Sequence, residues 1–190
     1  MSKVEGKKKV RRSAVDLLDA GLNLLAEHSI QQLTIDALCK QLCVTKGSFY
    51  HHFKGREDYL ERMLEHWVNE WTIKSMNSAS LAGESAAQRF DAIVEKSHDL
   101  PLGPETSIRS WALTDSTAQR YLEKVDLIRM DYLYEIFKEI SGSHNRALTL
   151  SQISYSLFIG TRMIVPEIED ERHKAIIKLM KSEVYGMSEK

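Results

Sequence analysis

The sequence predicts an all-α protein of about nine helices. Apolar residues recur at steps of three and four along most of the chain, which is the period of one helix face. No stretch shows the alternation of a half-buried strand, and no internal repeat is visible. The 190 residues include only three prolines and nine glycines, and 43% are hydrophobic, which is enough for a substantial core.

The first predicted helix covers residues 11–28. Its apolar stripe consists of Ala14, Leu17, Leu18, Gly21, Leu22, Leu25 and Ala26. Residues 1–9 form a lysine-rich arm, which is either a solvated tail or a segment that follows a phosphate backbone. Residues 29–33 connect this helix to the next, and we expect Ile30 and Leu33 in the core.

Residues 34–53 predict two short helices joined by a tight turn. Thr34 can cap the first helix, whose inward positions are Ile35, Leu38, Cys39 and Leu42. The turn is Cys43-Val44, and Thr45 can cap the second helix by accepting from a free backbone amide. The second helix carries Lys46, Ser48, Phe49, Tyr50, His51, His52 and Phe53. This pattern is typical of the helix-turn-helix unit, whose second helix can lie in the DNA major groove.

Further helices are predicted along the rest of the chain. The helix after the motif begins at residue 56 and runs to about residue 75, and a small, polar loop of residues 75–85 follows it. A break that contains glycine and proline is expected at residues 100–104. The remaining predicted helices cover residues 86–100, 105–113, 117–140, 145–165 and 169–186.

The charge is distributed unevenly between the two ends of the chain. The formal net charge is -1, but residues 1–56 hold ten Lys/Arg against five Asp/Glu, whereas residues 57–190 hold sixteen against twenty-two. A basic N-terminal part on an acidic body is typical of a DNA-reading head on a body that does not bind DNA. The alternative is that the lysine-rich tail alone produces this asymmetry.

The two cysteines, Cys39 and Cys43, are predicted to be small buried apolar residues. No second Cys/His pair with ligand spacing accompanies them, so we expect neither a metal site nor a cofactor. No signal peptide and no stretch of 18 apolar residues is found, so a cytoplasmic protein without a membrane partner is expected.

Residues 44–60, VTKGSFYHHFKGREDYL, resemble the signature of the TetR family of tetracycline-repressor-like regulators. That family usually reads Val-Ser-Lys-Gly-Thr-Leu-Tyr-x-His-Phe, followed by a short turn and Lys-x-x-Leu. The resemblance covers roughly residues 10–70, and the remaining chain is similar only in length and helical character. Cys43 stands where the family usually has glycine, and Leu42 where it usually has alanine. A non-glycine residue in a left-handed turn is strained, so either the turn bends differently here or a small energetic cost is tolerated.

The resemblance implies a helix-turn-helix DNA-binding domain at residues 10–56, with the motif at 34–53, and an effector-binding and dimerisation domain at 57–190. It implies major-groove docking of the second motif helix. The residues that it places at the DNA are Thr45, Lys46, Gly47, Ser48, Tyr50, His52 and Arg56. Lysine and arginine neutralise phosphate, and tyrosine and histidine donate hydrogen bonds to it. The alternative is that these residues are only a solvated polar face.

The resemblance also implies a homodimer that pairs its last two helices and reads a near-palindromic operator in double-stranded DNA. The expected interface residues are Ile153, Ser156, Leu157, Gly160, Ile164, Ile176, Met180 and Val184, unless both stripes pack only within their own chain. An unknown small-molecule effector would occupy a cavity in the body. Its candidate lining residues are Trp111, Tyr121, Met130, Tyr134, Phe158 and Met163, unless these are plain core.

The function implied is a ligand-responsive transcriptional regulator, by family habit a repressor. No nucleophile beside a base, no paired-carboxylate site and no phosphate-cradling glycine loop is found, so we do not expect an enzyme. Two other classes remain open. One is an architectural protein that binds DNA without sequence preference, and the other is a helical small-molecule-binding protein with a vestigial DNA head.

Overall fold

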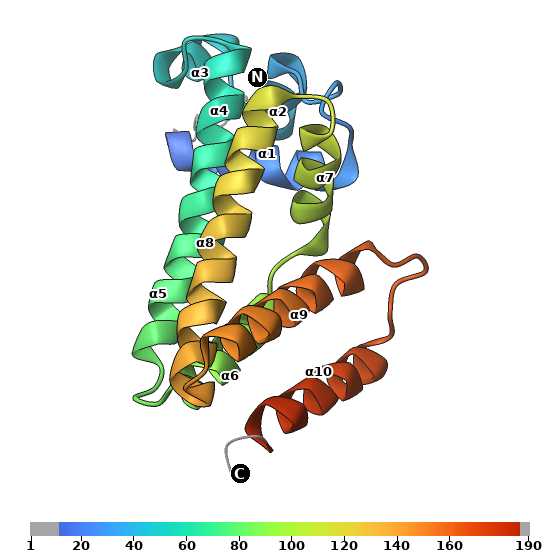
Figure 1. The fold of residues 1–190 in the computed structure, drawn as a ribbon. Helices are drawn as coiled ribbons and strands as arrows, with labels where there is room; N and C mark the ends of the chain where they lie inside the picture. The colour runs from blue at the N-terminus through green and yellow to red at the C-terminus, as the bar shows by residue number, and fades with distance from the viewer. Residues whose placement is uncertain (1–11, 187–190) are drawn as a thin grey trace, which may run out of the picture.

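The computed structural model describes residues 12–186, which are helical from end to end without a strand (Figure 1). The helices are α1 Ala14–Glu27, α2 Ile35–Gln41, α3 Lys46–His52, α4 Arg56–Trp67, the π-helical η1 Val68–Ile73, α5 Lys74–Leu81, α6 Ala86–His98, α7 Leu102–Ala112, α8 Ser116–Ser141, α9 His144–Met163 and α10 Asp170–Tyr185. Because α4, η1 and α5 follow one another without a break, these described residues form nine helical rods. The predicted all-α fold class is confirmed.

Helices α1, α2 and α3 form a head at one end of the molecule (Figure 1). Helix α1 begins at Ala14 because Ser13 forms a capping box with Asp16. It is therefore shorter than the predicted 11–28. Residues 1–11, including the lysine-rich arm and the start of the predicted domain 10–56, lie outside the described residues.

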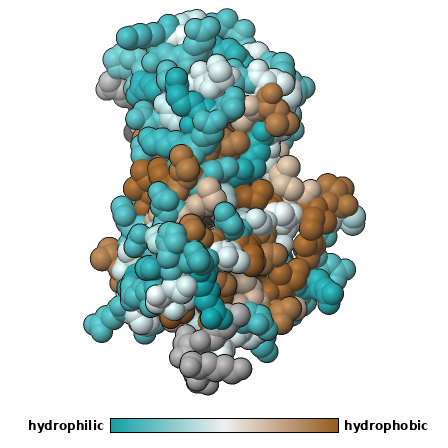
Figure 2. All heavy atoms as spheres, viewed as in Figure 1, coloured by the Kyte–Doolittle hydropathy of each residue, from teal (hydrophilic) through white to brown (hydrophobic). Residues whose placement is uncertain are grey.

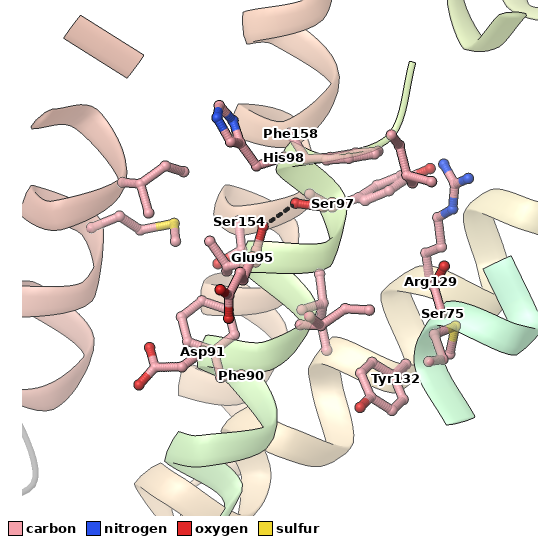
Figure 3. A pocket seen from close by; sticks show the side chains of 18 of the residues that line it. Ser75, Phe90, Asp91, Glu95, Ser97, His98, Arg129, Tyr132, Ser154 and Phe158 are labelled. Atoms are coloured by element: carbon pink, nitrogen blue, oxygen red, sulfur yellow. Dashed lines mark hydrogen bonds between the residues drawn. The ribbon is translucent and has the colours of Figure 1, made fainter. Parts of the chain in front are cut away.

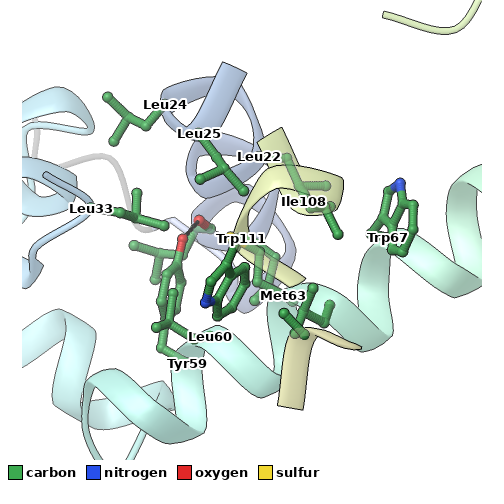
Figure 4. Close-up of a cluster of buried hydrophobic side chains, with 14 of the residues drawn as sticks. Leu22, Leu24, Leu25, Leu33, Tyr59, Leu60, Met63, Trp67, Ile108 and Trp111 are labelled. Atoms are coloured by element: carbon green, nitrogen blue, oxygen red, sulfur yellow. Dashed lines mark hydrogen bonds between the residues drawn. The ribbon is translucent and has the colours of Figure 1, made fainter. Parts of the chain in front are cut away.

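The head shares one apolar core with the helices that follow it (Figure 4). Tyr59 of α4 is buried, and its hydroxyl donates to the Leu17 carbonyl of α1 at 2.7 Å. Ile108 and Trp111 of α7 belong to the same cluster, and so does Leu33, as the sequence predicts. The core therefore crosses the predicted domain boundary at residue 56, and that boundary stays a prediction.

Two predicted breaks in the chain are present but shorter than expected, at residues 82–85 and 99–101. Residues 75–81, expected within a polar loop, belong to α5, where Ala79 is fully buried and Ser80 donates to the Met76 carbonyl. Helix α7 begins at Leu102 and contains Pro104 in its first turn. Proline is tolerated there because the first amides of a helix have no intrahelical acceptor to lose.

Helix α7 lies against α1 and joins the body to the head. Gly103 makes this contact possible, since a Cβ at this position would lie 2.6 Å from the Ala26 Cβ and 3.0 Å from its Cα. Any larger residue would have to push the two helices apart. The body reaches the head through this contact and through α4.

A buried cluster of charged side chains holds α7, α8 and η1 together. Arg129 of α8 donates to both carboxylate oxygens of Glu105 in α7, at 3.0 and 3.2 Å, and to the Thr72 hydroxyl in η1 at 3.1 Å. Glu105 is 3% exposed and Arg129 8%. Burial by itself would lower the pKa of Arg129, but the charges of Glu105 and Tyr155 and the hydrogen bonds with them together raise this pKa.

Arg109 extends the cluster on its other side. It donates to Glu105 at 3.0 Å and to the two carboxylate oxygens of Asp126 at 3.2 and 2.7 Å. The hydroxyl of Tyr155 in α9 donates to Asp126 at 2.5 Å. Two arginines thus face two carboxylates, and the cluster is electrically balanced.

The far end of the body has a second, smaller core of Ala86, Phe90, Ile136, Phe137, Ala147 and Val184. Helix α9 crosses α8, and α10 lies on the outside beside α9 (Figure 1). Hydrophobic side chains gather on the surface around α9 and α10, whereas the head is largely hydrophilic (Figure 2). No helix among residues 12–186 combines the length and apolar character needed to cross a bilayer.

Replacing Glu105 by glutamine should lower the free energy of unfolding by about 3–5 kcal/mol. The reason is that Arg129 and Arg109 would remain buried without the carboxylate that they share. Urea denaturation followed by circular dichroism measures this change.

Glu135→Gln is the matched control. Glu135 is exposed on α8 and has no ion pair within residues 12–186, so its change should stay within about 0.5 kcal/mol. Equal denaturation midpoints for the two variants would contradict a stabilising role of the cluster.

Candidate nucleic-acid interface and cavity

Helix α3 is held in the head by its cap, its apolar side and one arginine. The Thr45 hydroxyl accepts from the Ser48 amide at 3.2 Å, as predicted. Phe49 is fully buried. At the other end of the helix, Arg62 of α4 donates to the His52 carbonyl at 2.7 Å, and its guanidinium lies 4.8 Å from the centre of the Phe53 ring. The orientation of α3 is therefore set on three sides.

The turn before α3 contains a left-handed residue, so of the two alternatives left open by the sequence the strained turn is the one found. Cys43 has φ 54°, and it is the one non-glycine residue with positive φ within residues 12–186. Cys39 is buried, and burial raises the pKa of its thiol. Cys43 is exposed, so the interpretation of both cysteines as buried apolar residues is wrong for Cys43. The tight turn leaves that side chain outside the core.

The outer side of α3 carries the side chains expected at the DNA. Lys46 and Gly47 are exposed, Tyr50 is 54% exposed, and Ser48 and His52 are half-buried. The head itself does not require glycine at position 47. A Cβ there would meet only the Thr45 hydroxyl, at an ordinary 3.8 Å. These residues form one solvent-facing polar surface, which we call the α3 surface.

Lys46 does not stand alone on the α3 surface. Its ammonium lies 2.7 Å from the carboxylate of Asp36 in α2, and the hydrogen bond with Asp36 raises the pKa of Lys46. Both side chains are largely exposed. An exposed pair of this kind contributes little to stability, so Lys46 can exchange Asp36 for a phosphate at small cost.

Arg56 lies inside the head. Its guanidinium donates to the Ile30 carbonyl at 2.7 Å and to the Leu33 carbonyl at 3.0 Å. Arg56 therefore fastens the start of α4 to the connection between α1 and α2. Its assignment to DNA stays a prediction, whereas its structural contacts are explicit.

A cavity of about 520 Å³ lies in the body, between η1, α5, α6, α8, α9 and α10. Figure 3 shows Phe90, His98 and Ser97 of α6, Phe158 of α9 and Arg129 of α8 around it. Its walls are mostly apolar. The volume falls within the range of small-molecule sites in proteins, which is roughly 300–1,000 Å³.

The structure corrects the predicted list of cavity residues. Of the six candidates, Phe158 lines this cavity. Trp111 is buried in the core that joins head and body, Tyr121 packs against that same core, and the Tyr134 hydroxyl lies 2.9 Å from the His144 ring. Met163 is 50% exposed, and Met130 is half-buried away from the cavity. Aromatic and Met side chains occur in every core, so residue type alone could not select the cavity wall.

The cavity residues that the sequence did not reveal include two arginines, Arg129 and Arg162. Arg162 stands four residues after Phe158, on the same face of α9 as Ser154 and Tyr155. One sequence pattern could have revealed Arg162: a cationic residue that shares one helix face with apolar and small residues at helical spacing. The Ser154 hydroxyl is buried and has no hydrogen-bond partner among the described residues.

The predicted dimer residues separate into two groups. Ile153 on α9 and Ile164 directly after it are each 49% exposed, Ser156 is exposed, and Leu157 and Gly160 are half-buried. On α10, Val184 is 1% exposed and packs in the smaller core of its own chain, which corrects its assignment to an interface. Ile176 and Met180 are half-buried, and Met180 lines the cavity.

Comparison with known proteins supports the assignment of the head. Residues 17–63 match the family described as "Bacterial regulatory proteins, tetR family". A relative from Bacillus subtilis, "Uncharacterized HTH-type transcriptional regulator YwcC", is 30% identical over 63 residues, which are 32% of this chain and 28% of that protein. The "Fatty acid metabolism regulator protein" of Bacillus subtilis is 24% identical over 96 residues, 50% of this chain and 49% of that protein. The matched part therefore spans at most about half of these relatives.

Solved structures extend the likeness to the whole fold. A putative transcriptional regulator from Pseudomonas aeruginosa PAO1 superposes with a TM-score of 0.69 at 14% identity, over 91% of this chain and 90% of that one. The fatty acid degradation regulator FadR from Bacillus halodurans gives a TM-score of 0.62 at 14% identity, over 96% and 95%. Residues 17–63, which contain the helix-turn-helix, thus match the tetR family of bacterial regulatory proteins, and the whole chain shares the fold of these solved structures.

Proposed function

We propose that this protein is a sequence-specific, DNA-binding transcriptional regulator. The observation that carries the proposal is the α3 surface, which presents polar side chains on a capped helix whose other side is fixed in the core. A recognition helix must be held rigidly to select a base sequence. The names of the relatives as transcriptional regulators support the same function.

Within this proposal, the α3 surface contacts DNA through a few defined groups. Lys46 exchanges Asp36 for a phosphate, and Tyr50 and His52 donate hydrogen bonds to phosphate oxygens. Ser48 is short enough to reach a base edge or a phosphate. Gly47 allows the helix backbone to approach the DNA, and the Thr45 hydroxyl caps the N-terminus of the helix.

The protein acts, we infer, as a homodimer on a near-palindromic operator. Ile153 of α9 and Ile164, directly after α9, are apolar and half exposed. Hydrophobic side chains gather on the surface around α9 and α10 (Figure 2). Pairing of two copies through α9 and the outer side of α10 buries this area and presents two α3 surfaces to two half-sites.

A ligand in the cavity provides a route to control the head. The cavity wall includes Arg129 and Thr72, which are hydrogen bonded to each other. Thr72 belongs to η1, which continues α4, the helix that follows the head. Arg129 also binds Glu105 of α7, the helix that packs on α1. A ligand that favours one arrangement of these helices shifts the population of DNA-competent molecules. We therefore propose a ligand-responsive regulator, and a repressor by family habit.

The experiment that tests this function is selection of genomic fragments by the purified protein at two salt concentrations, with Tyr50→Ala as the control. Enrichment of one near-palindromic site by the wild type, lost in the variant, is the expected result. Uniform, salt-sensitive binding of all fragments would favour an architectural protein instead.

Lys46→Ala and Tyr50→Ala should each weaken binding to the selected site and to unrelated DNA by similar factors. Each should also reduce the slope of log affinity against log salt by about one, because one phosphate contact is lost. Fluorescence anisotropy at four salt concentrations measures both quantities. Arg146→Ala is the control, since Arg146 is an exposed cation on α9 of the body. A variant with unchanged affinity and slope would refute the phosphate contact at its position.

Gly47→Ala separates folding from DNA binding. The new Cβ has room inside the head, and alanine favours helices over glycine by up to about 1 kcal/mol, so thermal stability should stay equal or rise. Operator affinity should fall by about tenfold or more, which corresponds to roughly 1.4 kcal/mol, because the methyl group enters the space next to the DNA. Undiminished affinity would exclude a close approach at position 47.

Ile153→Glu should convert the dimer into a monomer, because it places two carboxylates in a buried apolar contact. Light scattering at micromolar concentration gives the mass of each species. Leu127→Glu is the matched control, since Leu127 is 59% exposed and belongs to α8, outside the two helices of the proposed interface. A monomeric wild type would contradict the homodimer.

A further inference from the structure

The cavity wall and the charged cluster beside it together hold three arginines but only two carboxylates. In the cluster beside it, the carboxylates of Glu105 and Asp126 face the guanidinium groups of Arg129 and Arg109. Arg162 is a third arginine, 9% exposed, and it has no carboxylate within 4.0 Å among residues 12–186. Burying a charge without a counter-ion costs free energy, because the charge loses its hydration. An anion that binds beside the charge recovers part of this cost.

The contacts of Arg162 hold it in place without neutralising it. It donates to the carbonyls of Ser97 and Phe158, and its guanidinium lies 4.1 Å from the centre of the Phe158 ring. The Ser97 carbonyl belongs to the last turn of α6, whose dipole offers only partial negative charge. Burial lowers the pKa of Arg162 to about 10, with Glu105 opposing the shift and Arg129 adding to it. Arg162 therefore remains a cation at neutral pH.

The other charged groups of the cavity are paired or exposed. Asp91 pairs with Lys181 at 2.6 Å and accepts from the Tyr185 hydroxyl at 2.7 Å. Glu95 and His98 are exposed. Burial, His98 and Arg162 together lower the pKa of His173, which reflects positive potential at this end of the cavity.

The rest of the cavity wall is suited to an apolar group. Phe90 and the side chains of Ile93, Val94, Leu133, Phe158, Ile177 and Met180 surround the space (Figure 3). Aromatic and Met side chains form adaptable apolar walls, and their burial by a ligand contributes about 25 cal/mol per Å². One end of the cavity therefore attracts an anion and the remainder attracts hydrocarbon.

We propose that the cavity binds an amphiphilic anion, a hydrocarbon chain that ends in one carboxylate or phosphate group, with the anionic group on Arg162. A guanidinium presents a planar fork of donors that matches both anions. The evidence for the binding site is the cavity itself, whereas any effect of the ligand on DNA binding rests on the proposed regulatory function.

The test is isothermal titration calorimetry of the full chain with three C12 probes, namely dodecanoate, dodecyl phosphate and 1-dodecanol, each kept below its aggregation concentration. At least one anion should bind about tenfold or more tightly than the alcohol, because only the anions form charge-assisted hydrogen bonds with Arg162. The ranking of the two anions identifies the head group. Equal affinity for all three probes, or no binding of any, would overturn the proposal.

Arg162→Met tests the residue. This variant should bind the anions no more tightly than the alcohol, while its affinity for 1-dodecanol stays close to that of the wild type. Arg162→Lys keeps the charge and should retain the preference for anions. Arg172→Met changes an exposed arginine of α10 outside the cavity and should leave all affinities unchanged. An anion preference that survives in Arg162→Met would refute the assignment to Arg162. If Arg162→Met does not fold, the three wild-type affinities still decide the proposal.

Failure of the proposed ligand class can be distinguished from failure of the proposed regulatory function. Operator binding measured with and without the preferred anion gives the second readout. Specific operator binding together with equal probe affinities would refute the ligand class and leave the regulator intact. Anion-selective binding without any effect on operator affinity would confirm the site and contradict ligand responsiveness.

Discussion

The arrangement of the body depends on the need to pair Arg129 away from water. A buried guanidinium requires both counter-charge and hydrogen-bond acceptors. Glu105 in α7 and Thr72 in η1 supply them, so the ion pair brings two distant segments onto α8. The same two segments lead to the head, because η1 continues α4 and α7 packs on α1 at Gly103. One interaction thereby joins the cavity wall to both connections of the head.

The two ends of the molecule have opposite surface chemistry. The apolar side chains of the head are buried in a core that it shares with α4 and α7, and polar groups cover its outside (Figure 2). At the other end, α9 and α10 keep apolar residues such as Ile153 and Leu179 partly exposed. This division favours nucleic acid at one end and a protein or hydrocarbon partner at the other.

The cavity and the buried ion cluster share a wall but differ in charge. Within the cluster each arginine has a carboxylate, so its contribution is to hold helices together. Arg162 lies beyond the cluster and interacts with the carbonyl end of α6 and the Phe158 ring, which fix its position without cancelling its charge. The contrast explains why neighbouring arginines in one cavity have different roles.

The sequence by itself determined the local features of this protein. The caps at Thr34 and Thr45 follow from short-range hydrogen bonding, and the burial of Leu38 and Cys39 follows from helical spacing. Only the tertiary structure decided that Arg56 binds the carbonyls of residues 30 and 33, that Val184 is core, and that the cavity is lined by arginines as well as aromatic residues. These outcomes depend on contacts between segments far apart in the chain. The pattern of residue types along one helix does not determine which other segment packs against that helix.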